Sequence, residues 1–419
     1  MKRILIVAGL IAVAVNALHA AYTPGLSAME KAKKWSVSAS VRGFYDDNYT
    51  TSPKGFAQSS FGFEVSPSAS LNIPLEQTFF GASYIYSLKY YQDRADKHQA
   101  SADHSHQFGA KLDHAFSERY KMTLSETFVV AQEPEILNAL GTVTVPLRLN
   151  GNNIRNTAAA DFTAQMTELM GLQFAYQNNY YDYDQSGPGS YSAALDRMEH
   201  LASANLRYQW QRPTVLIAGY QFGLVNYLSN DSLVTAGPFV SPEIRDNRSH
   251  YLFIGADHSF NQQLNAAVRV GARYTDYYEA GGNSITPYAD GNLTYTYAPG
   301  SYLQAGVRHD RSQTDVLTTL DQEATTVYVA ITHRITSLLT GNVLGQYQHS
   351  SFNEKTVTTL PGSKGSDNYF VASVNLAYRI DRAGHWLAET GYNYDKLNSD
   401  LPFRAYTRNR VYIGIRATY

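Results

Sequence analysis

The amino-acid sequence predicts an all-β protein: a transmembrane antiparallel up-and-down β-barrel of about 18 strands, with short periplasmic turns and long extracellular loops. Three observations predict this fold. Apolar and polar residues alternate along most of the chain, short and long connections alternate between those segments, and the last segment ends in the aromatic residue Tyr419. No stretch rich in Pro, Gly or charge divides the 419 residues, so one continuous barrel is the simplest organisation.

The alternation has a period of two residues, which is the period of a β-strand. Between residues 61 and 73 apolar side chains occupy every other position, while Gly, Glu, Ser and Asn fill most of the rest. Residues 264–275 and 370–379 repeat this pattern. Each run lasts roughly 10 to 14 residues, longer than the ~5 to 6 that are typical of soluble strands. Tilted strands that cross a bilayer need about this length, which disfavours a soluble β-sandwich.

The connections between these runs are of two kinds. Tight turns are predicted at 117–119, 261–263, 298–300, 334–337 and 381–384. Long polar or Gly/Pro-rich connections are predicted at 46–58, 132–151, 182–196, 228–247, 310–322, 350–367 and 395–407. Short and long connections alternate when hairpins are tight on the periplasmic side and extended outside. With an even number of strands, both chain ends are then expected in the periplasm.

The first residues have the pattern of a secretory signal peptide. Lys2 and Arg3 precede an apolar run from Ile4 to Val15, and small residues follow up to Ala21. We expect residues 1–20 to be the signal peptide, 21–34 a short periplasmic lead-in and 35–419 the barrel. The alternative, an uncleaved anchor, is disfavoured because the apolar run is shorter than the ~20 residues that a spanning helix needs.

Composition excludes several classes of function. The net charge is −2 and no Lys/Arg cluster occurs, so no nucleic-acid partner is expected. The chain has no Cys, which removes disulfides, thiolate metal sites and Cys nucleophiles. No Ser/His spacing typical of a hydrolase occurs, so we expect no enzyme activity, cofactor or metal site. The 33 tyrosines, against 3 tryptophans, suit an interface between lipid and water.

The last predicted strand runs from Arg408 to the end of the chain. Its apolar residues alternate with polar ones, and the final residue is aromatic. This ending resembles the C-terminal signal that the barrel-assembly machinery reads in outer-membrane proteins. The residues of the candidate assembly signal are Val411, Ile413, Ile415, Ala417 and Tyr419.

Together with the alternation over nearly all of the mature chain, this ending resembles the family called putative β-barrel porin 2. The resemblance implies an outer-membrane channel of a Gram-negative-type bacterium, with outer-membrane lipid and the barrel-assembly machinery as partners. It rests on the overall pattern, so no functional residue of the family is transferred to a position in this chain.

A barrel of about 18 strands is too wide for its own side chains to fill, so a water-filled lumen is expected. The polar positions of the strands predict its lining, in which basic residues outnumber acidic ones. The candidate lumen-lining residues are Arg42, Lys111, Arg155, Arg207, Arg269, Arg273, Arg308, Arg379, Arg410, Arg416, Glu64, Asp113, Glu199, Asp290 and Glu389. Unpaired arginines would favour anions. Alternatively, the charges pair across strands and brace the wall.

These observations predict a porin-like channel for passive diffusion of small hydrophilic solutes, with anions favoured if the basic excess stays unpaired. A barrel for polysaccharide or oligosaccharide export or uptake is the first alternative, and a structural or adhesive surface barrel is the second. Two long connections contain apolar residues and could narrow the pore, 132–151 and 228–247. Of these we favour 132–151 as the constriction, because long loops are often functional.

Overall fold

A computed structural model describes residues 26, 28–97, 100–131, 151–352 and 365–419. The predicted signal peptide and nearly all of the predicted constriction at 132–151 lie outside the described residues. The strands are β1 (Trp35–Asp46), β2 (Ser60–Pro74), β3 (Thr78–Tyr91), β4 (Ala102–Ala115), β5 (Tyr120–Ala131), β6 (Asn153–Gln165), β7 (Met170–Tyr183), β8 (Arg197–Gln211), β9 (Thr214–Tyr227), β10 (Asn247–Ser259), β11 (Leu264–Asp276), β12 (Asn283–Ala298), β13 (Ser301–Ser312), β14 (Gln322–Arg334), β15 (Leu339–Phe352), β16 (Ser366–Arg379), β17 (Trp386–Ser399) and β18 (Tyr406–Thr418).

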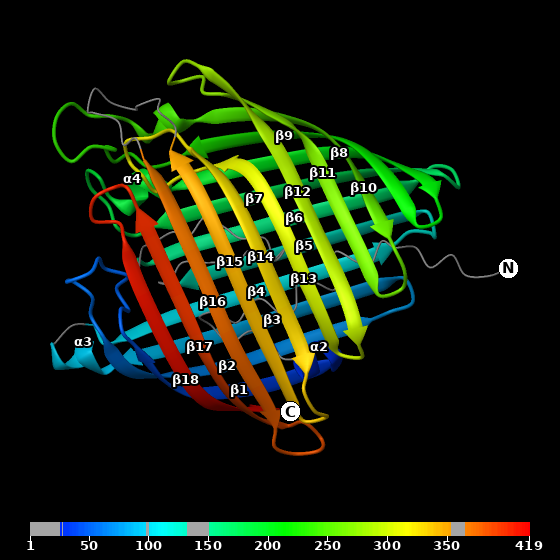
Figure 1. The fold of residues 1–419 in the computed structure, drawn as a ribbon, viewed down its shortest axis with the longest axis horizontal. Coiled ribbons are helices and arrows are strands. Elements are labelled where there is room, and N and C mark those ends of the chain that lie inside the picture. The colour runs from blue at the N-terminus through cyan, green and yellow to red at the C-terminus, as the bar shows by residue number, and fades with distance from the viewer. Residues whose placement is uncertain (1–25, 27, 98–99, 132–150, 353–364) are drawn as a thin grey trace.

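In the described part of the chain these strands form one 18-stranded sheet that closes on itself (Figure 1). Each strand pairs antiparallel with its neighbours in sequence, and β1 also pairs with β18. The closing register runs from Ser38 opposite Thr418 to Asp46 opposite Arg410. This closed antiparallel barrel confirms the predicted fold class and strand number.

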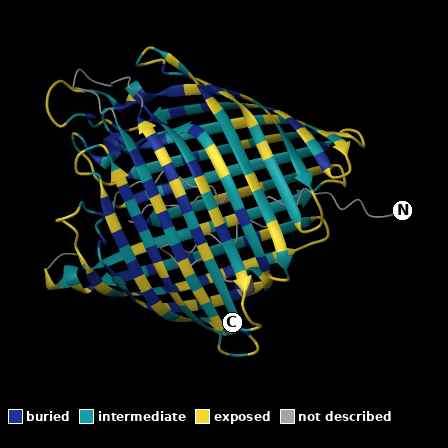
Figure 2. Cartoon of the chain, in the orientation of Figure 1, coloured by how far each residue is buried: buried dark blue, intermediate teal, exposed yellow. Residues whose placement is uncertain are grey.

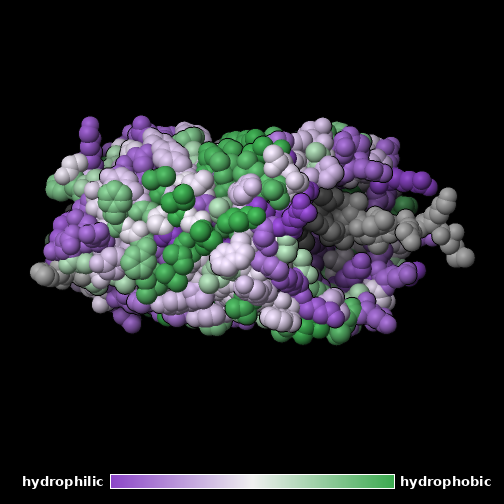
Figure 3. Space-filling model, turned by 90° about the horizontal axis from the view of Figure 1, so that it is seen from below, coloured by the Kyte–Doolittle hydropathy of each residue, from purple (hydrophilic) through white to green (hydrophobic). Residues whose placement is uncertain are grey.

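The two faces of the barrel wall differ in chemistry, as Figure 2 shows by its checkerboard of buried and exposed positions. Inward-facing Arg42 and Arg410 are only 5% and 2% exposed, whereas outward-facing Ile254 and Ile413 are 65% and 70% exposed. Figure 3 shows apolar surface over the middle of one side of the wall and hydrophilic surface toward its two ends. An exposed apolar band between polar ends matches the hydrocarbon layer of a bilayer.

The two ends of the barrel are built differently. One end, here called the turn end, carries the tight connections, such as the one from Pro74 to Thr78, together with the first residue of β1 and the last of β18. At this end Tyr419 exchanges two backbone hydrogen bonds with Val37, of 3.1 and 2.9 Å. The opposite end, here called the loop end, carries the long connections. The predicted alternation of short and long connections is therefore present.

Several predicted loop boundaries were wrong by a few residues. Asp46 ends β1, Asp310 lies within β13, and β17 continues to Ser399, so that Asp395 belongs to a strand. These residues are polar ends of strands whose inward face is polar throughout, and polarity alone made them resemble loop. The connection between β3 and β4, which contains the helix α3 (Gln92–Asp96), was not among the predicted long connections.

Short helices accompany the wall. They are α2 (Ala28–Ala32), α3, α4 (Tyr191–Leu195) and the 3-10 helix η3 (Pro242–Arg245). Among the described residues, no helix combines the length and apolar character that membrane crossing requires. The helix α2 contacts β1 and β2 and lies within the outline of the barrel in Figure 1.

Pairs of Tyr and His side chains lie on the outward face, toward the loop end. The hydroxyl of Tyr84 lies 2.9 Å from Nδ1 of His106, and the hydroxyl of Tyr220 lies 2.7 Å from Nδ1 of His250. The same arrangement joins Tyr176 to the ring of His200, at 2.8 Å. Rings with an apolar body and a polar edge are typical of the boundary between lipid and water.

The closing seam gives a stability prediction. A Cβ atom at Gly414 would lie 2.4 Å from the carbonyl oxygen of Val41, whereas a Cβ at Gly43 would meet nothing within 4 Å. Both glycines lie in the β1–β18 pair. We expect Gly414→Ala to destabilise the barrel by about 1–3 kcal/mol, because the overlap is with backbone. Gly43→Ala should leave stability unchanged. The stability of each variant is measured by unfolding in urea in detergent, with the folded fraction read from heat-modifiable gel migration. Equal urea midpoints for Gly414→Ala and wild type would contradict this account of the seam.

Candidate functional site

The lumen is the candidate site, because the strand registers place every candidate lumen-lining residue on the inward face. The positions are Arg42 on β1, Glu64 on β2, Lys111 and Asp113 on β4, Arg155 on β6, Glu199 and Arg207 on β8, Arg269 and Arg273 on β11, Asp290 on β12, Arg308 on β13, Arg379 on β16, Glu389 on β17, and Arg410 and Arg416 on β18. The barrel brings many of these together in ion pairs across neighbouring strands.

A chain of alternating charges, here called the charge ladder, runs up the wall formed by β17, β18, β1 and β2. At the turn end, Nη1 of Arg416 lies 3.1 Å from Oε2 of Glu30 in α2, and its Nε lies 3.1 Å from Oε1 of Glu389. Glu389 is also bound by Arg42, whose Nη2 lies 2.6 Å from Oε2. Glu389 thus contacts guanidinium groups from two strands, β18 and β1, and Glu30 contacts one from β18.

The ladder continues through Glu64, which is fully buried. Its Oε2 lies 4.0 Å from Arg42 and 3.6 Å from Arg410, and its Oε1 lies 3.9 Å from the amine of Lys89. Nearer the loop end, Arg408 binds the carboxylate of Asp46 with its Nε at 2.9 Å and its Nη2 at 2.5 Å. The three cations around Glu64, and the bound guanidinium of Arg408 at Asp46, offset the cost of removing these carboxylates from water.

Aromatic rings hold the ladder arginines in position. The guanidinium carbon of Arg42 lies 4.7 Å from the ring centre of Tyr412, and that of Arg410 lies 4.6 Å from the ring centre of Phe44. The hydroxyl of Tyr412 donates to Oδ1 of Asn375 at 2.7 Å, which orients this ring. Ring faces attract cations and restrict their rotation, so the ladder is a fixed array of charge.

The wall across the barrel, formed by β8 to β13, carries a second set of ion pairs. Asp257 lies between two arginines, 3.1 Å from Arg207 and 2.6 Å from Arg269. Asp310 likewise contacts Arg308 at 3.1 Å and Arg273 at 3.4 Å. The geometry therefore supports wall bracing by paired charges for much of the predicted lining.

Some inward cations have no carboxylate partner. Among the described residues, no carboxylate lies within ion-pairing distance of Lys121, Arg334 or Arg379. Arg334 and Arg379 donate instead to the backbone carbonyl of Ser337 in the β14–β15 turn. All three side chains lie at the turn end, so the unpaired positive charge of the lumen is concentrated there.

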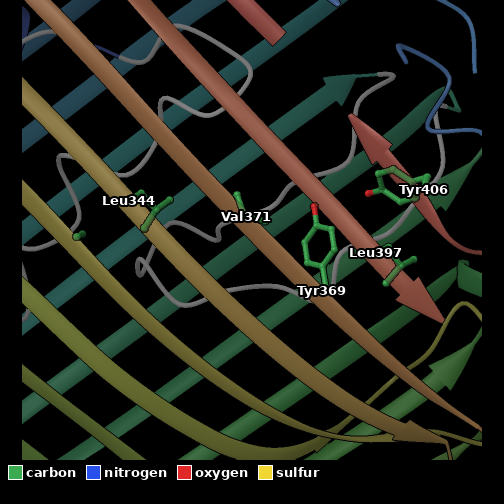
Figure 4. Close-up of a cluster of buried hydrophobic side chains, with 6 residues drawn as sticks. Leu344, Tyr369, Val371, Leu397 and Tyr406 are labelled. Carbon is green, nitrogen blue, oxygen red and sulfur yellow. The ribbon is translucent and has the colours of Figure 1, made fainter. Parts of the chain in front are cut away.

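An apolar patch adjoins the ladder on the inward face of β14 to β18 (Figure 4). Val371 faces Asp395 across the β16–β17 pair, and Tyr406 precedes the ladder residue Arg408 on the same face of β18. The lumen thus combines apolar and charged surface side by side. The patch consists of Ala330, Leu344, Tyr369, Val371, Leu397 and Tyr406.

At the loop end, connections fold inward and pack together into what is here called the cap. Its core joins Ala193 of α4 to Leu233, Tyr277 and Leu320, which belong to the connections after β9, β11 and β13. A neighbouring cluster packs Ala194 and Leu195 against Tyr183 on the inward face of β7. The predicted apolar connection 228–247 is therefore part of a packed structure at the loop end.

Arg245 is the central polar group of the cap and is fully buried. Its guanidinium donates to the carbonyl oxygens of Ala194 at 3.1 Å and Thr314 at 3.4 Å, and also to that of Val316. Its charge lies 5.7 Å from the ring centre of Tyr227. Because its side chain donates hydrogen bonds to backbone carbonyls of two separate connections, Arg245 links the segments of the cap to one another.

A bidentate ion pair ties the cap to the connection between β17 and β18. Nη1 and Nη2 of Arg404, in the β17–β18 connection, lie 3.0 and 2.9 Å from the two carboxylate oxygens of Asp315, in the β13–β14 connection. Nη2 of Arg404 also lies 2.7 Å from Asp367 of β16. The contact passes the loop ends of β15 and β16, so it fixes the cap to this neighbouring part of the rim.

Comparison with known protein families found a match to one family model. The family described as Putative beta-barrel porin 2 matches residues 322–419, which span β14 to β18. This match confirms the predicted resemblance for that part of the chain. No curated protein matches the chain.

Three solved structures are similar to this chain. OccK2 (OpdF) of Pseudomonas aeruginosa, in complex with glucuronate, has 11% identity, covers 92% of this chain and 98% of its own, and has a TM-score of 0.46. OccAB4 of Acinetobacter baumannii has 11% identity, coverage of 92% and 99%, and a TM-score of 0.46. OpdK of Pseudomonas aeruginosa with vanillate has 11% identity, covers 92% of this chain and 99% of its own, and has a TM-score of 0.46.

Sequence reasoning missed four of the nine ladder residues and two of the six residues in the ion pairs of β8 to β13. The acidic partners Asp46, Asp257 and Asp310 were not among the candidates, nor were Arg408 and Lys89. The alternation of faces could have identified Asp46 and Arg408. Asp46 is an even number of residues from Arg42 on β1, and Arg408 is an even number from Arg410 on β18, so each pair shares a face. Glu30 had no such signal, because it lies in the lead-in and is placed in the lumen by α2. There Ser68 donates to its Oε1 at 2.6 Å.

Two carboxylates of the cap make its docking sensitive to pH. Burial raises the pKa of Asp196 and of Asp246 from 3.8 to about 6 in each case. A docked cap therefore binds protons more tightly than an exposed one, so its docking gains stability as the pH falls through about 6 and loses it as the pH rises. We expect hydrogen exchange of residues 191–196 and 242–246, corrected for intrinsic rates, to be slower at about pH 5 than at about pH 7.5.

The double variant D196N/D246N is the control for this pH effect, because its neutral amides mimic the protonated carboxyls. It should show slow exchange at both pH values. An unchanged pH dependence in this variant would assign the effect to other groups.

The Arg404 contact gives a second prediction for the cap. Arg404→Ala leaves the buried carboxylates of Asp315 and Asp367 without this cation, at a cost of about 3–5 kcal/mol to the docked arrangement. We expect noisier and larger single-channel conductance in planar bilayers. Arg404→Lys should lie between wild type and Arg404→Ala, because it keeps the charge and loses the bidentate geometry. Conductance traces identical to wild type for Arg404→Ala would show that the cap does not limit the current.

Proposed function

We propose that this chain is an outer-membrane channel for passive diffusion of small hydrophilic solutes, with a preference for anions. The observation that carries the proposal is the closed barrel whose inward face is lined with charged and polar side chains. Barrels of 16 to 18 strands are too wide for their own side chains to fill, so water occupies the remaining interior. A polar interior that is open to water gives small solutes a path through the membrane.

The outward face and the two ends support placement in the outer membrane. The exposed apolar band requires a lipid environment, and outer-membrane barrels place their tight turns in the periplasm. The turn end is then periplasmic and the loop end extracellular. Both chain termini lie in the periplasm, where Tyr419 is available to the barrel-assembly machinery before the β1–β18 pair closes.

The anion preference rests on the distribution of charge along the lumen. Unpaired Lys121, Arg334 and Arg379 make the turn end positive. Of the inward carboxylates that lack an ion pair, Asp290 lies opposite Arg269 and Arg308 in its two strand pairs. Asp395 lies opposite Arg408. Asp161 of β6 has neither an ion pair nor a cation opposite it and accepts from Thr163 and Gln173. Cations thus lie opposite two of these three carboxylates, and the three unpaired cations at the turn end support a positive potential there that attracts anions.

A catalytic role has no place in this proposal. Every histidine in the described strands occupies an outward-facing position, so the lumen lining of the described strands offers no imidazole base. Within the described residues, no group of His, Cys, Asp and Glu side chains is arranged to hold a metal ion. The lumen residues act by their fixed charge and by excluding large solutes.

Reversal potentials in a salt gradient test the anion preference. We expect wild type to prefer chloride over potassium, and Arg379→Glu and Arg334→Glu to lower that preference severalfold, because each reverses a charge at the inner rim. Arg382→Glu is the matched control: this exposed residue lies in the turn after β16, off the inward face of the wall, and should leave the reversal potential nearly unchanged. Cation preference in wild type would refute the anion assignment, and a barrel without conductance would refute the channel.

A further inference from the structure

The residues that precede β1 do not leave the barrel at the turn end but fold back into the lumen. The backbone carbonyl of Lys34 accepts from the amide of Asn72, near the turn end of β2. The carbonyl of Glu30 accepts from Ser70 at 2.8 Å, and its carboxylate accepts from Ser68 at 2.6 Å. From Lys34 back to Glu30, the chain therefore meets positions of β2 that lie progressively farther from the turn end.

The wall that α2 contacts is lined with short side chains. The inward faces of β1 and β2 carry serine at six positions, all of them buried: Ser36, Ser38, Ser40, Ser66, Ser68 and Ser70. On the neighbouring strands β17 and β18, the larger side chains of Glu389 and Arg416 project inward. Small residues let the backbone of a helix approach closely, so the serine face of β1 and β2 gives α2 a seat on the lumen wall.

Glu30 fixes α2 on this seat. Its side chain is fully buried and both carboxylate oxygens are bound, Oε1 by Ser68 and Oε2 by Arg416 at 3.1 Å. Arg416 belongs to β18, so this contact joins α2 to a third strand in addition to β1 and β2. Nδ2 of Asn72 donates to the carbonyls of Glu30 and Lys33, at 3.1 and 2.8 Å. These contacts hold in place a five-residue helix that would not persist alone in water.

We propose that α2 is a constriction of the channel at its turn end, and that Glu30 is the positioning residue that holds it there. An α-helix with its side chains is about 10 to 12 Å wide, so a helix seated on the wall takes a substantial part of the lumen from the path of solutes. This inference rests on the proposed channel function. It adds the element that limits solute size at the turn end.

Two substitutions that remove the same charge test the anchor. Glu30→Ala and Glu30→Gln each remove one negative charge from the lumen, but the glutamine still accepts from Ser68 and Arg416. We expect Glu30→Ala to raise single-channel conductance about twofold above that of Glu30→Gln, because the alanine variant releases α2. Polyethylene glycols of graded mass, added during the recordings, measure the largest polymer that enters the pore. That limit should rise in Glu30→Ala and stay near the wild-type value in Glu30→Gln.

Cysteine modification tests the position of α2 with Glu30 intact. The chain has no cysteine of its own, so each introduced thiol reports one position. Ala32 is an exposed residue of α2. We expect a maleimide that carries a short polyethylene glycol chain to lower the conductance of Ala32→Cys by about half, because the added chain occupies the constriction. The matched control is Ala383→Cys, an exposed alanine in the tight turn between β16 and β17, whose modification should leave the conductance unchanged.

Heat-modifiable gel migration verifies that each variant is folded. Equal conductance and equal polymer limits in Glu30→Ala and Glu30→Gln would overturn the proposal. So would a modified Ala32→Cys that conducts like the modified Ala383→Cys. In either case a conducting wild type leaves the proposed channel in place. Absence of conductance in wild type and in every variant would instead refute the channel, and the constriction with it.

Discussion

Backbone hydrogen bonding in an apolar medium is the constraint on which this structure depends. A strand within a bilayer can satisfy its N–H and C=O groups only through another strand, so the sheet must have no free edge. Here the requirement is met where β18 returns to β1, from Ser38 opposite Thr418 to Asp46 opposite Arg410. Once this seam closes, the alternation along every strand becomes a division between an outside and an inside. The apolar wall, the polar lumen and the ends of the barrel all follow from that division.

Closure also determines which charges meet. Arg42 and Glu389 are 347 residues apart in the chain, yet they form the shortest contact of Glu389 because β1 and β17 flank the same strand, β18. A carboxylate as deeply buried as Glu64 is tolerable because cations from β1, β3 and β18 surround it. The cap follows the same principle at the loop end, where Nη1 of the buried Arg245 donates to carbonyl groups of neighbouring connections.

The architecture could be predicted from the sequence because its signals are local. Alternation with a period of two residues assigned Arg42, Glu64 and Arg410 to the polar face. The lengths of the connections indicated which strand ends lie at the same end of the barrel. Ion-pair partners could not be predicted, because they depend on the register between strands that are distant in sequence. Strand ends such as Asp46 and Asp395 looked like loop, since polarity does not distinguish a lumen-facing strand end from a solvent-exposed connection. The cap and the position of Glu30 depend on contacts among segments that carry no periodic pattern.

Two glutamates show how the surroundings of one residue type differ between the two faces of the wall. Glu64 faces inward, where the converging radius of the barrel brings three basic side chains around it. Glu126 faces outward, where the surface diverges and the adjacent cations are on the other side of the sheet. Because closure prevents a side chain from changing faces without shifting its whole strand, Glu126 cannot use the cations of the lumen. Among the residues that the structure describes, the polar side chain that reaches Glu126 is the amide of Asn156.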